Sequence, residues 1–502
     1  MGLAAKSSGG PTVGIDIGSD LIKVVEAKPG KDGIQVTALG IAPTPPGTIS
    51  NEVISDPQAL GQAIRKLLTE SGISCKRSVS SVAGQSSVIV RIIEVPKMTK
   101  QELAETMKWE IERHVPFAAN EVIMDFQPIE RSTTAPDDQN MEVLLAVAQR
   151  EVINAHIETL FAAGLEPVAI DVQPLAVCRS LVDSSSDDAR QQTIAIVNIG
   201  STSTEMGVYQ NGLLTFPRTL PIAGGAITRA LSDGLNISVQ QAERLKREKA
   251  VVLLDRAAQF APSAGFGEME QLSEIDQSDA TVGLSDSTAQ DKSGGDFGFI
   301  PGLGFGIPEE PSAGQPDTAA NSDLPDFDVD MGTPVAEPIV PVMDFDLAGT
   351  DDGVAAPPKA QFDISGSADD ITSASAELSE PLTQFSAEEN NEIALPEFSE
   401  ETIFDAILPV LNDLIAEIRR SLEYFASRFQ SQPDRILLCG GSAKLKDLDK
   451  LIQGEMGIPV FVANPLQNVT VFSKALSEDY LEEVATIFPV SVGLAIRDMI
   501  GE

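Results

Sequence analysis

The stretch VGIDIGSDLIKVVE, residues 13–26, has a counterpart in IAIVNIGSTSTEMGVY, residues 194–209. Each copy consists of an apolar strand, a turn that follows Ile-Gly and contains small polar residues, and a second apolar strand. Such a turn has no bulky side chain, so its backbone N–H groups can approach a phosphate closely. Two of these hairpins on two related halves predict a phosphate chain held in a cleft between domains.

The composition indicates a globular protein long enough for two or more domains. The 502 residues are 42% hydrophobic, with a mean hydropathy of +0.02, and no run of 18 apolar residues predicts a transmembrane helix. The N-terminal residues lack the apolar core of a secretory signal and predict a flexible tail. Three distant cysteines fit a reducing cytoplasm, and the two histidines argue against a zinc site or a histidine-activated nucleophile.

Most of the net charge of −40 lies in one segment. Residues 257–390 contain 27 Asp and Glu but only two Lys and Arg, a net charge of −25. This acidity argues against binding to nucleic acid or directly to anionic lipid. The segment has no sustained period and predicts disorder. Its nine Phe residues, many in contexts such as PDFDVD, leave two interpretations open: a solvated spacer, or short motifs that dock on partners.

The first hairpin contains the charged groups expected at a phosphate site. Asp16 ends a buried strand, where a carboxylate has little structural use, so we interpret it as a Mg²⁺ ligand through water. Gly18 and Ser19 form the turn. Lys23 lies four residues beyond Ser19 and can reach back toward a β-phosphate; the alternative places it on a solvated strand face.

The second hairpin repeats the loop but not the charge. Gly200, Ser201, Thr202 and Ser203 form the candidate phosphate loop. Asn198 stands at the strand end that corresponds to Asp16. An amide accepts from a metal-bound water but carries no charge, which predicts weaker Mg²⁺ binding or poorer alignment of an attacking water.

A third turn is a candidate for the nucleoside. Gly440, Gly441 and Ser442 follow the buried strand ILLC and could lie against an adenine. Glu243 and Lys246 are spaced i,i+3 on a predicted helix and could hold the ribose and base edge. Their alternative is a surface ion pair of little energetic weight.

The order of these three turns resembles that of the actin-like ATPases, a superfamily that includes actin, heat-shock ATPases, sugar kinases and FtsA. A closer resemblance is to the PilM family, the cytoplasmic actin-like proteins of type IV pilus assembly. The segments that carry it are VPKMTKQELAETMKWEIERHVPF (95–117), EVIMDFQPIE (121–130), AGLEPVAIDVQPLAV (163–177), GGAITRALSDGLNISVQQAERLK (224–246) and ILLCGGSAKLKDLDKLIQGEMGIPV (436–460). The first of these is more specific than any glycine loop, and it opens as a T-x-x-E capping box at Thr99.

The resemblance implies an α/β fold with two ribonuclease H-like halves, an FtsA/PilM-type extra subdomain and a long disordered acidic insertion. The expected parts are a flexible tail (1–12), the first half (13–95 and 169–191), the extra subdomain (96–168), the second half (192–255 and 397–502) and the insertion (256–396).

The resemblance also implies ATP and Mg²⁺ as cofactors. Asp16 and Gln173 would be the catalytic residues, Gln173 as a water-orienting group, and Asp16 would be the metal residue. The residues implied to hold the nucleotide are Asp16, Gly18, Ser19, Lys23, Asn198, Gly200, Ser201, Thr202, Ser203, Gly225, Glu243, Lys246, Gly440, Gly441 and Ser442. The departure at Asn198 suggests that ATP would lock the fold rather than drive rapid turnover.

By the same resemblance, the protein would be a cytoplasmic scaffold at the periphery of the inner membrane. It would capture the N-terminal peptide of a PilN-like inner-membrane protein near the extra subdomain and contact other pilus assembly proteins. Its oligomeric state stays open between a monomer and a homo-oligomer or ring. One alternative is an FtsA-like filament-forming division protein, which the ending GLAIRDMIGE disfavours because it is no basic amphipathic helix. Another is a small-molecule kinase, for which no acceptor site is evident.

Overall fold

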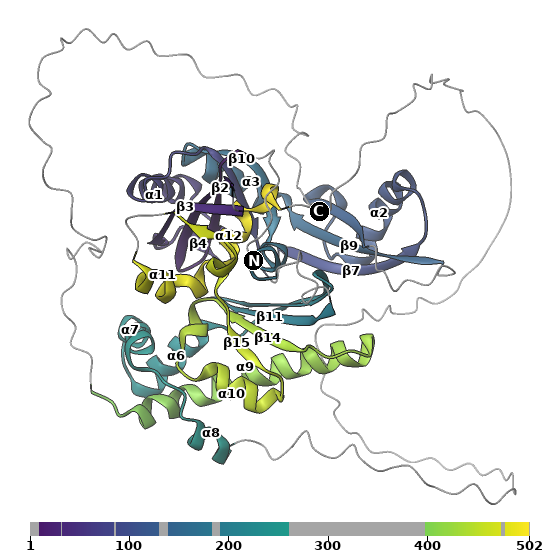
Figure 1. Ribbon diagram of the computed structural model, residues 1–502. Helices are drawn as coiled ribbons and strands as arrows, with labels where there is room; N and C mark the ends of the chain where they lie inside the picture. Colours follow the sequence, from purple (N-terminus) through teal and green to yellow (C-terminus); the bar gives the residue numbers. More distant parts are fainter. Residues whose placement is uncertain are drawn as a thin grey trace, which may run out of the picture. The chain divides into compact units, whose positions relative to one another are not determined.

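The computed structural model describes residues 10–31, 33–84, 87–129, 139–182, 191–260, 397–472 and 477–500 (Figure 1). The predicted disordered insertion lies outside these residues, except for its first five. Those five complete helix α8 (Leu254–Phe260), so the prediction of disorder from residue 256 is wrong at its start. Ala257 is buried there and Arg256 Nε donates to Asp405 Oδ1 at 2.6 Å, contacts that the sequence pattern did not indicate.

A six-stranded sheet forms the first half, in the order β10-β6-β1-β2-β3-β16. Its strands β1, β2 and β3 are antiparallel, and β6 and β10 run parallel to β1. The strands are β1 (Thr12–Ile17), β2 (Leu21–Gly30), β3 (Gly33–Pro43), β6 (Arg77–Val82), β10 (Glu166–Val172) and β16 (Thr470–Val471). Helices α1 (Pro57–Glu70) and α3 (Arg150–Ala162) pack together against this sheet, and a small hairpin joins β4 (Ile49–Ser50) to β5 (Val53–Ile54).

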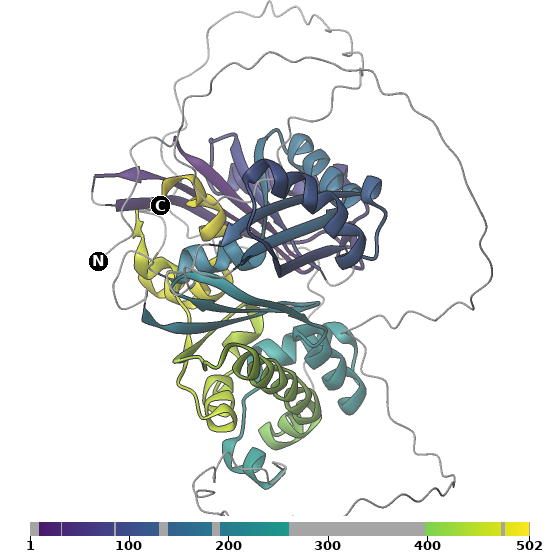
Figure 2. The ribbon, with the colours of Figure 1, turned by 90° about the vertical axis from the view of Figure 1, so that its right-hand side faces the viewer.

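The second half repeats the same plan with five strands, in the order β13-β12-β11-β14-β15. An antiparallel meander is again joined at its first strand, β11, by a parallel strand, β14. The strands are β11 (Thr193–Ile199), β12 (Thr204–Gln210), β13 (Leu213–Leu220), β14 (Arg435–Cys439) and β15 (Val460–Val462). The helices are α6 (Gly224–Leu235), α7 (Val239–Lys249), α9 (Glu400–Phe429) and α10 (Leu448–Met456), seen from a second side in Figure 2. The apolar residues Ile403, Ile407 and Leu411 recur at steps of four in the sequence and predict a helix over 401–428, which α9 confirms.

A separate three-stranded sheet, in the order β7-β9-β8, forms the extra subdomain. It consists of β7 (Val88–Pro96), β8 (Val122–Ile129) and β9 (Asn140–Gln149), covered by α2 (Lys100–His114). The predicted capping box is confirmed: Thr99 N donates to Glu102 Oε2 at 2.8 Å, and Glu102 N to Thr99 Oγ1 at 3.4 Å. The sheet begins at Val88, before the expected bound of 96, and ends at Gln149, before that of 168, because α3 joins the first half instead.

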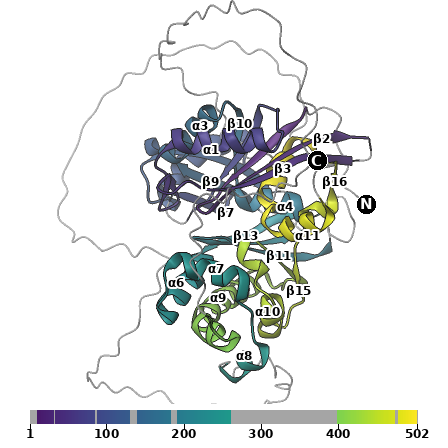
Figure 3. The ribbon, with the colours of Figure 1, turned by 90° about the vertical axis from the view of Figure 1, so that its left-hand side faces the viewer.

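The C-terminal segment returns to the first half, although the sequence placed all of 397–502 in the second. Strand β16 pairs with β3 (Figure 3), and α12 (Pro489–Ala495) packs on β1 and on α4 (Gln173–Leu181). The remaining elements are α11 (Glu478–Val484) and the 3₁₀ turns η1 (Ala119–Glu121), η2 (Gly441–Lys444), η3 (Pro465–Asn468), η4 (Ala485–Ile487) and η5 (Arg497–Met499). Phe488 and Val492 are fully buried beside Val25 and Val36, which explains the return by burial of apolar area.

Two glycines let the backbones of this segment and the first half touch. A Cβ at Gly493 would lie 1.7 Å from the Ala176 carbonyl oxygen in α4, and one at Gly14 would lie 2.1 Å from the Ser491 carbonyl oxygen. No other residue fits at either position without displacing backbone.

The described residues contain no helix with the length and hydropathy of a membrane span.

We predict that Gly493→Ala lowers the free energy of unfolding by about 2–3 kcal/mol, because its methyl group overlaps the backbone of α4. Urea denaturation, monitored by circular dichroism, measures the change in the free energy of unfolding. Gly454→Ala is the matched control: it lies in helix α10 with no heavy atom within 4 Å of the added Cβ. It should be neutral or stabilising by about 0.5–1 kcal/mol. Equal stability of the two variants would contradict the packing of α12.

Candidate functional site

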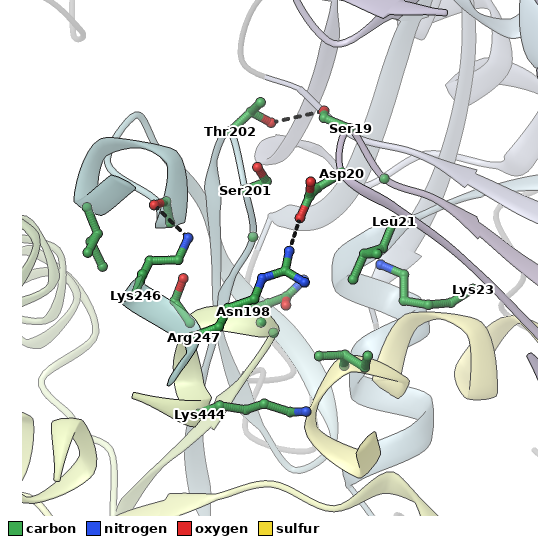
Figure 4. Close-up of a pocket in the computed structure, with 18 of the residues that line it drawn as sticks. Ser19, Asp20, Leu21, Lys23, Asn198, Ser201, Thr202, Lys246, Arg247 and Lys444 are labelled. Carbon is green, nitrogen blue, oxygen red and sulfur yellow. Dashed lines mark hydrogen bonds and ion pairs between the residues drawn. The ribbon is translucent and has the colours of Figure 1, made fainter. Parts of the chain in front are cut away.

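The hairpin turns of both halves and the Gly-Gly turn line one cavity of about 910 Å³ (Figure 4). Every residue predicted for the site lies on its wall except Gly225. The wall also includes groups that the sequence did not single out. The polar ones used below are Asp20, Glu52, His156, Glu205, Arg247 and Lys444.

The first hairpin presents an ion pair to this cavity. Gly18 N donates to Leu21 O at 3.1 Å and closes the turn. Asp16 and Lys23 face each other across β1 and β2, with Lys23 Nζ 2.7 Å from Asp16 Oδ2. Their side chains are 5% and 14% exposed, so the alternative of a solvated strand face for Lys23 is wrong. A cation and a carboxylate are therefore fixed beside the turn.

The second hairpin is closed in the same way, by Gly200 N donating to Ser203 O at 3.0 Å. The N-terminus of α6 supports this loop, because Gly224 N and Gly225 N donate to the carbonyls of Gly200 and Ser201 at 2.9 and 2.8 Å. Gly225 thus holds the loop from behind and does not reach the cavity. This position differs from its expected place at the nucleoside.

The two turns approach each other across the cavity. Ser19 Oγ lies 3.4 Å from Thr202 Oγ1, and Arg247 on α7 pairs with Asp20 at 2.9 Å (Figure 4). Thr202 Oγ1 also donates to Oε1 of Glu52 at 3.4 Å, and Glu52 lies in the turn between β4 and β5. The loops that the sequence suggested as two sides of one phosphate site therefore do lie on two sides of one cavity.

The Gly-Gly turn is held against the second hairpin. Gly440 has φ +89°, and a Cβ there would lie 2.3 Å from the Ile199 carbonyl oxygen, so the position requires glycine. Gly440 N donates to Thr486 O at 2.7 Å. Beyond the turn, Gly441 and Ser442 begin η2 at the cavity wall.

Glu243 and Lys246 form an ion pair of 2.7 Å on α7, as the alternative of a surface ion pair predicted, but both residues also line the cavity. Lys246 Nζ donates to Thr228 Oγ1 at 2.8 Å and to the Gly224 carbonyl at 3.2 Å. Burial raises the pKa of Glu243, but hydrogen bonds from Lys246 and Thr228 outweigh it and hold the pKa below its usual value. This network fixes α7 to the start of α6.

Several titratable groups on the wall that the sequence did not single out have a shifted pKa. Burial, opposed by a hydrogen bond from Thr219, raises the pKa of Glu205 to about 7. Burial lowers the pKa of His156, which is 6% exposed on α3, to about 4, so its imidazole is neutral at pH 7. Burial also lowers the pKa of Lys444. The only signal for Glu205 was its place seven residues after Asn198, the same separation as that of Lys23 from Asp16.

These residues fit a nucleotide with a hydrated Mg²⁺. The described part of the chain has no group of three His, Cys, Asp or Glu side chains arranged as a metal cage. Mg²⁺ in nucleotide sites needs none, because phosphates and waters supply most of its ligands. The two glycine turns have backbone N–H groups that could donate to phosphate. The carboxylates of Asp16 and Glu205 line the cavity and could accept hydrogen bonds from metal-bound water.

Comparison with known proteins connects this geometry to a family. The profile of the type IV pilus assembly protein PilM matches residues 14–252, and that of the cell division protein FtsA matches residues 195–480. FtsA of Bacillus subtilis (strain 168) is 25% identical over 267 residues, which are 49% of this chain and 60% of the relative. FtsA of Neisseria meningitidis serogroup B is 23% identical over 277 residues, which are 51% and 63%. The chain thus spans less than two thirds of these relatives.

A solved structure described as the PilM-PilN type IV pilus biogenesis complex has the same fold. Its similar chain is 23% identical, with a TM-score of 0.62, and the match covers 97% of this chain and 98% of that one. The predicted actin-like fold with two related halves is thereby confirmed. The two profiles together span residues 14–480, and they show that the chain belongs to the FtsA/PilM group of proteins, within the superfamily of the actin-like ATPases.

Proposed function

We propose that this protein is an ATP-binding scaffold of a type IV pilus machine, located in the cytoplasm at the inner membrane. The observation that carries the proposal is the meeting of two phosphate-type turns across one cavity, with Ser19 and Thr202 only 3.4 Å apart. A nucleotide that bridges these turns would join the two halves and hold one arrangement of them.

Each part of the nucleotide has a matching group in the cavity. The turns at Gly18 and Gly200 would hold the phosphates by backbone N–H groups, with Lys23 as the cation. Asp16 would hold the waters of Mg²⁺, which neutralises phosphate charge when it is bound. Gly440 and its neighbours would lie against the nucleoside, and the Glu243–Lys246 pair would hold the ribose.

We do not expect rapid hydrolysis of ATP at this site. Asn198 supplies no charge where Asp16 stands in the other half, and the residue expected to orient water is Gln173, the first residue of α4, which lies on the wall. An uncharged amide at this position orients water without activating it as a base. At most slow ATP turnover follows, and the nucleotide serves mainly to fix the structure.

The extra subdomain offers a docking edge for the partner. Among the described strands, β8 pairs only with β9, so one edge of β8 has no strand partner and would be the place for an extended peptide to pair. Trp109 on α2 is 72% exposed and is the chain's single tryptophan. The similar solved chain comes from a complex with PilN, which supports a PilN-like N-terminal peptide as ligand. Membrane attachment would then come through this partner.

A second candidate function is that of an FtsA-like filament-forming protein. The match to the FtsA profile and the identities with curated FtsA proteins favour it. Sedimentation with Mg²⁺ and ATP separates the two functions: the scaffold should remain a small species, whereas a filament former should pellet.

We predict that Asp16→Ala weakens ATP binding more than tenfold, because it removes the acceptor for metal-bound water. It should also lower the free energy of unfolding by about 3 kcal/mol, because it leaves Lys23 buried without its partner. Calorimetric titration with ATP and urea denaturation measure the two effects. The double variant Asp16→Ala/Lys23→Met should regain most of the stability but not the affinity. Wild-type affinity in Asp16→Ala would contradict the site.

We also predict that an N-terminal peptide of a PilN-like protein binds the extra subdomain and changes the fluorescence of Trp109. The single tryptophan makes this signal specific to α2. Fluorescence titration with and without ATP, together with anisotropy of a labelled peptide, measures binding. A peptide of the same composition in scrambled order is the control. The adaptor function fails when neither method detects binding in either nucleotide state.

A further inference from the structure

The two phosphate hairpins have the same register but different charges. Asp16 faces Lys23 in the first hairpin, and Asn198 faces Glu205 in the second, with seven residues between the partners in each case. Residues paired across two strands point to the same face of the sheet, so Glu205 shares the face of Asn198, and both line the cavity. The second hairpin therefore has a carboxylate after all, on its other strand.

Glu205 has no structural partner that accounts for its charge. Thr219 Oγ1 donates to its Oε2 at 2.7 Å, and the nearby Ser203 hydroxyl also lowers its pKa, but its buried Oε1 has no hydrogen bond of good geometry. Within the described residues, no Lys or Arg forms an ion pair with it. A buried, ionised carboxylate oxygen without a good donor is unfavourable. When no ligand is bound, a proton relieves this cost, in accord with the raised pKa of Glu205, and a ligand that donates to Oε1 would relieve it in the ionised form.

The surroundings specify what that ligand is. Glu52, which reaches the same loop through Thr202, adds a second negative charge and thereby opposes ionisation of Glu205. Glu52 sits in a left-handed turn with φ +66°, in the half opposite Glu205. Two carboxylates beside phosphate turns repel a bare phosphate, and a hydrated divalent cation removes that repulsion while donating hydrogen bonds from its waters.

We propose that Glu205 is the positioning carboxylate of the second half: it accepts from the water shell of the nucleotide's Mg²⁺, in place of the carboxylate absent at Asn198. This inference rests on the proposed function, because the cation enters with the nucleotide. Asp16 in the first half and Glu205 in the second would then hold the hydrated cation from both sides of the cavity.

Glu205→Gln tests the proposal, since it keeps the shape and removes the charge. Calorimetric titration with ATP, at a series of Mg²⁺ concentrations and in EDTA, gives the Mg²⁺ concentration needed for half-maximal gain in affinity. We expect this concentration to rise about tenfold or more in the variant, as for other groups that hold metal-bound water. ATP affinity in EDTA should not fall. Glu26→Gln is the matched control: Glu26 also accepts from a threonine, Thr37, at 2.6 Å, but it is not on the cavity wall.

Asn198→Asp in the Glu205→Gln background provides the rescue. A carboxylate returned to position 198 should restore the Mg²⁺ dependence toward that of the unchanged protein. The proposal is overturned when Glu205→Gln keeps the original Mg²⁺ dependence, when it gains ATP affinity equally with and without Mg²⁺, or when the folded double variant shows no rescue. Absence of ATP binding in the unchanged protein would instead overturn the proposed function, and this inference with it.

Discussion

The backbone contact of helix α12 with β1 and α4 is the constraint on which the site depends. It requires glycine at Gly14 and at Gly493, where a side chain would overlap backbone. Asp16 lies two residues beyond Gly14, so the contact fixes the strand that delivers the carboxylate to the cavity. In the same C-terminal segment, just before α12 begins, the carbonyl oxygen of Thr486 accepts a hydrogen bond from the N–H of Gly440. One segment thus ties the Gly-Gly turn of the second half to the hairpin turn of the first.

Charge is distributed unequally over the repeated halves. The first hairpin neutralises its carboxylate internally, by Lys23, whereas the second leaves Glu205 without a cation. An internally paired site stays stable when it is empty, but an unpaired buried carboxylate favours the state in which a cation is bound. The fold is duplicated and its charges are asymmetric, so a nucleotide bound with Mg²⁺, as proposed, would stabilise one arrangement of the halves.

Local patterns were enough to predict the hairpins, the capping box at Thr99 and the long helix α9, because strand alternation, caps and helical periodicity are encoded over a few residues. The path of the C-terminal segment was not predictable in this way. Its burial depends on the distant residues Val25 and Val36, and its close approach on Gly14. Glu205 was missed because a glutamate in a strand looks solvent-exposed until the cross-strand register is known. Arg247 and Asp20 pair over 227 positions, beyond the reach of any periodicity.

The central claim is that three turns far apart in the sequence hold one nucleotide. Hydrogen–deuterium exchange with mass spectrometry, with and without ATP and Mg²⁺, tests it most directly, because these turns donate backbone N–H groups to the ligand. The account predicts that amides at 19–20, 201–203 and 441–442 gain protection together, over the same range of ATP concentration. Protection of one turn alone, or of none at saturating ATP, would contradict it.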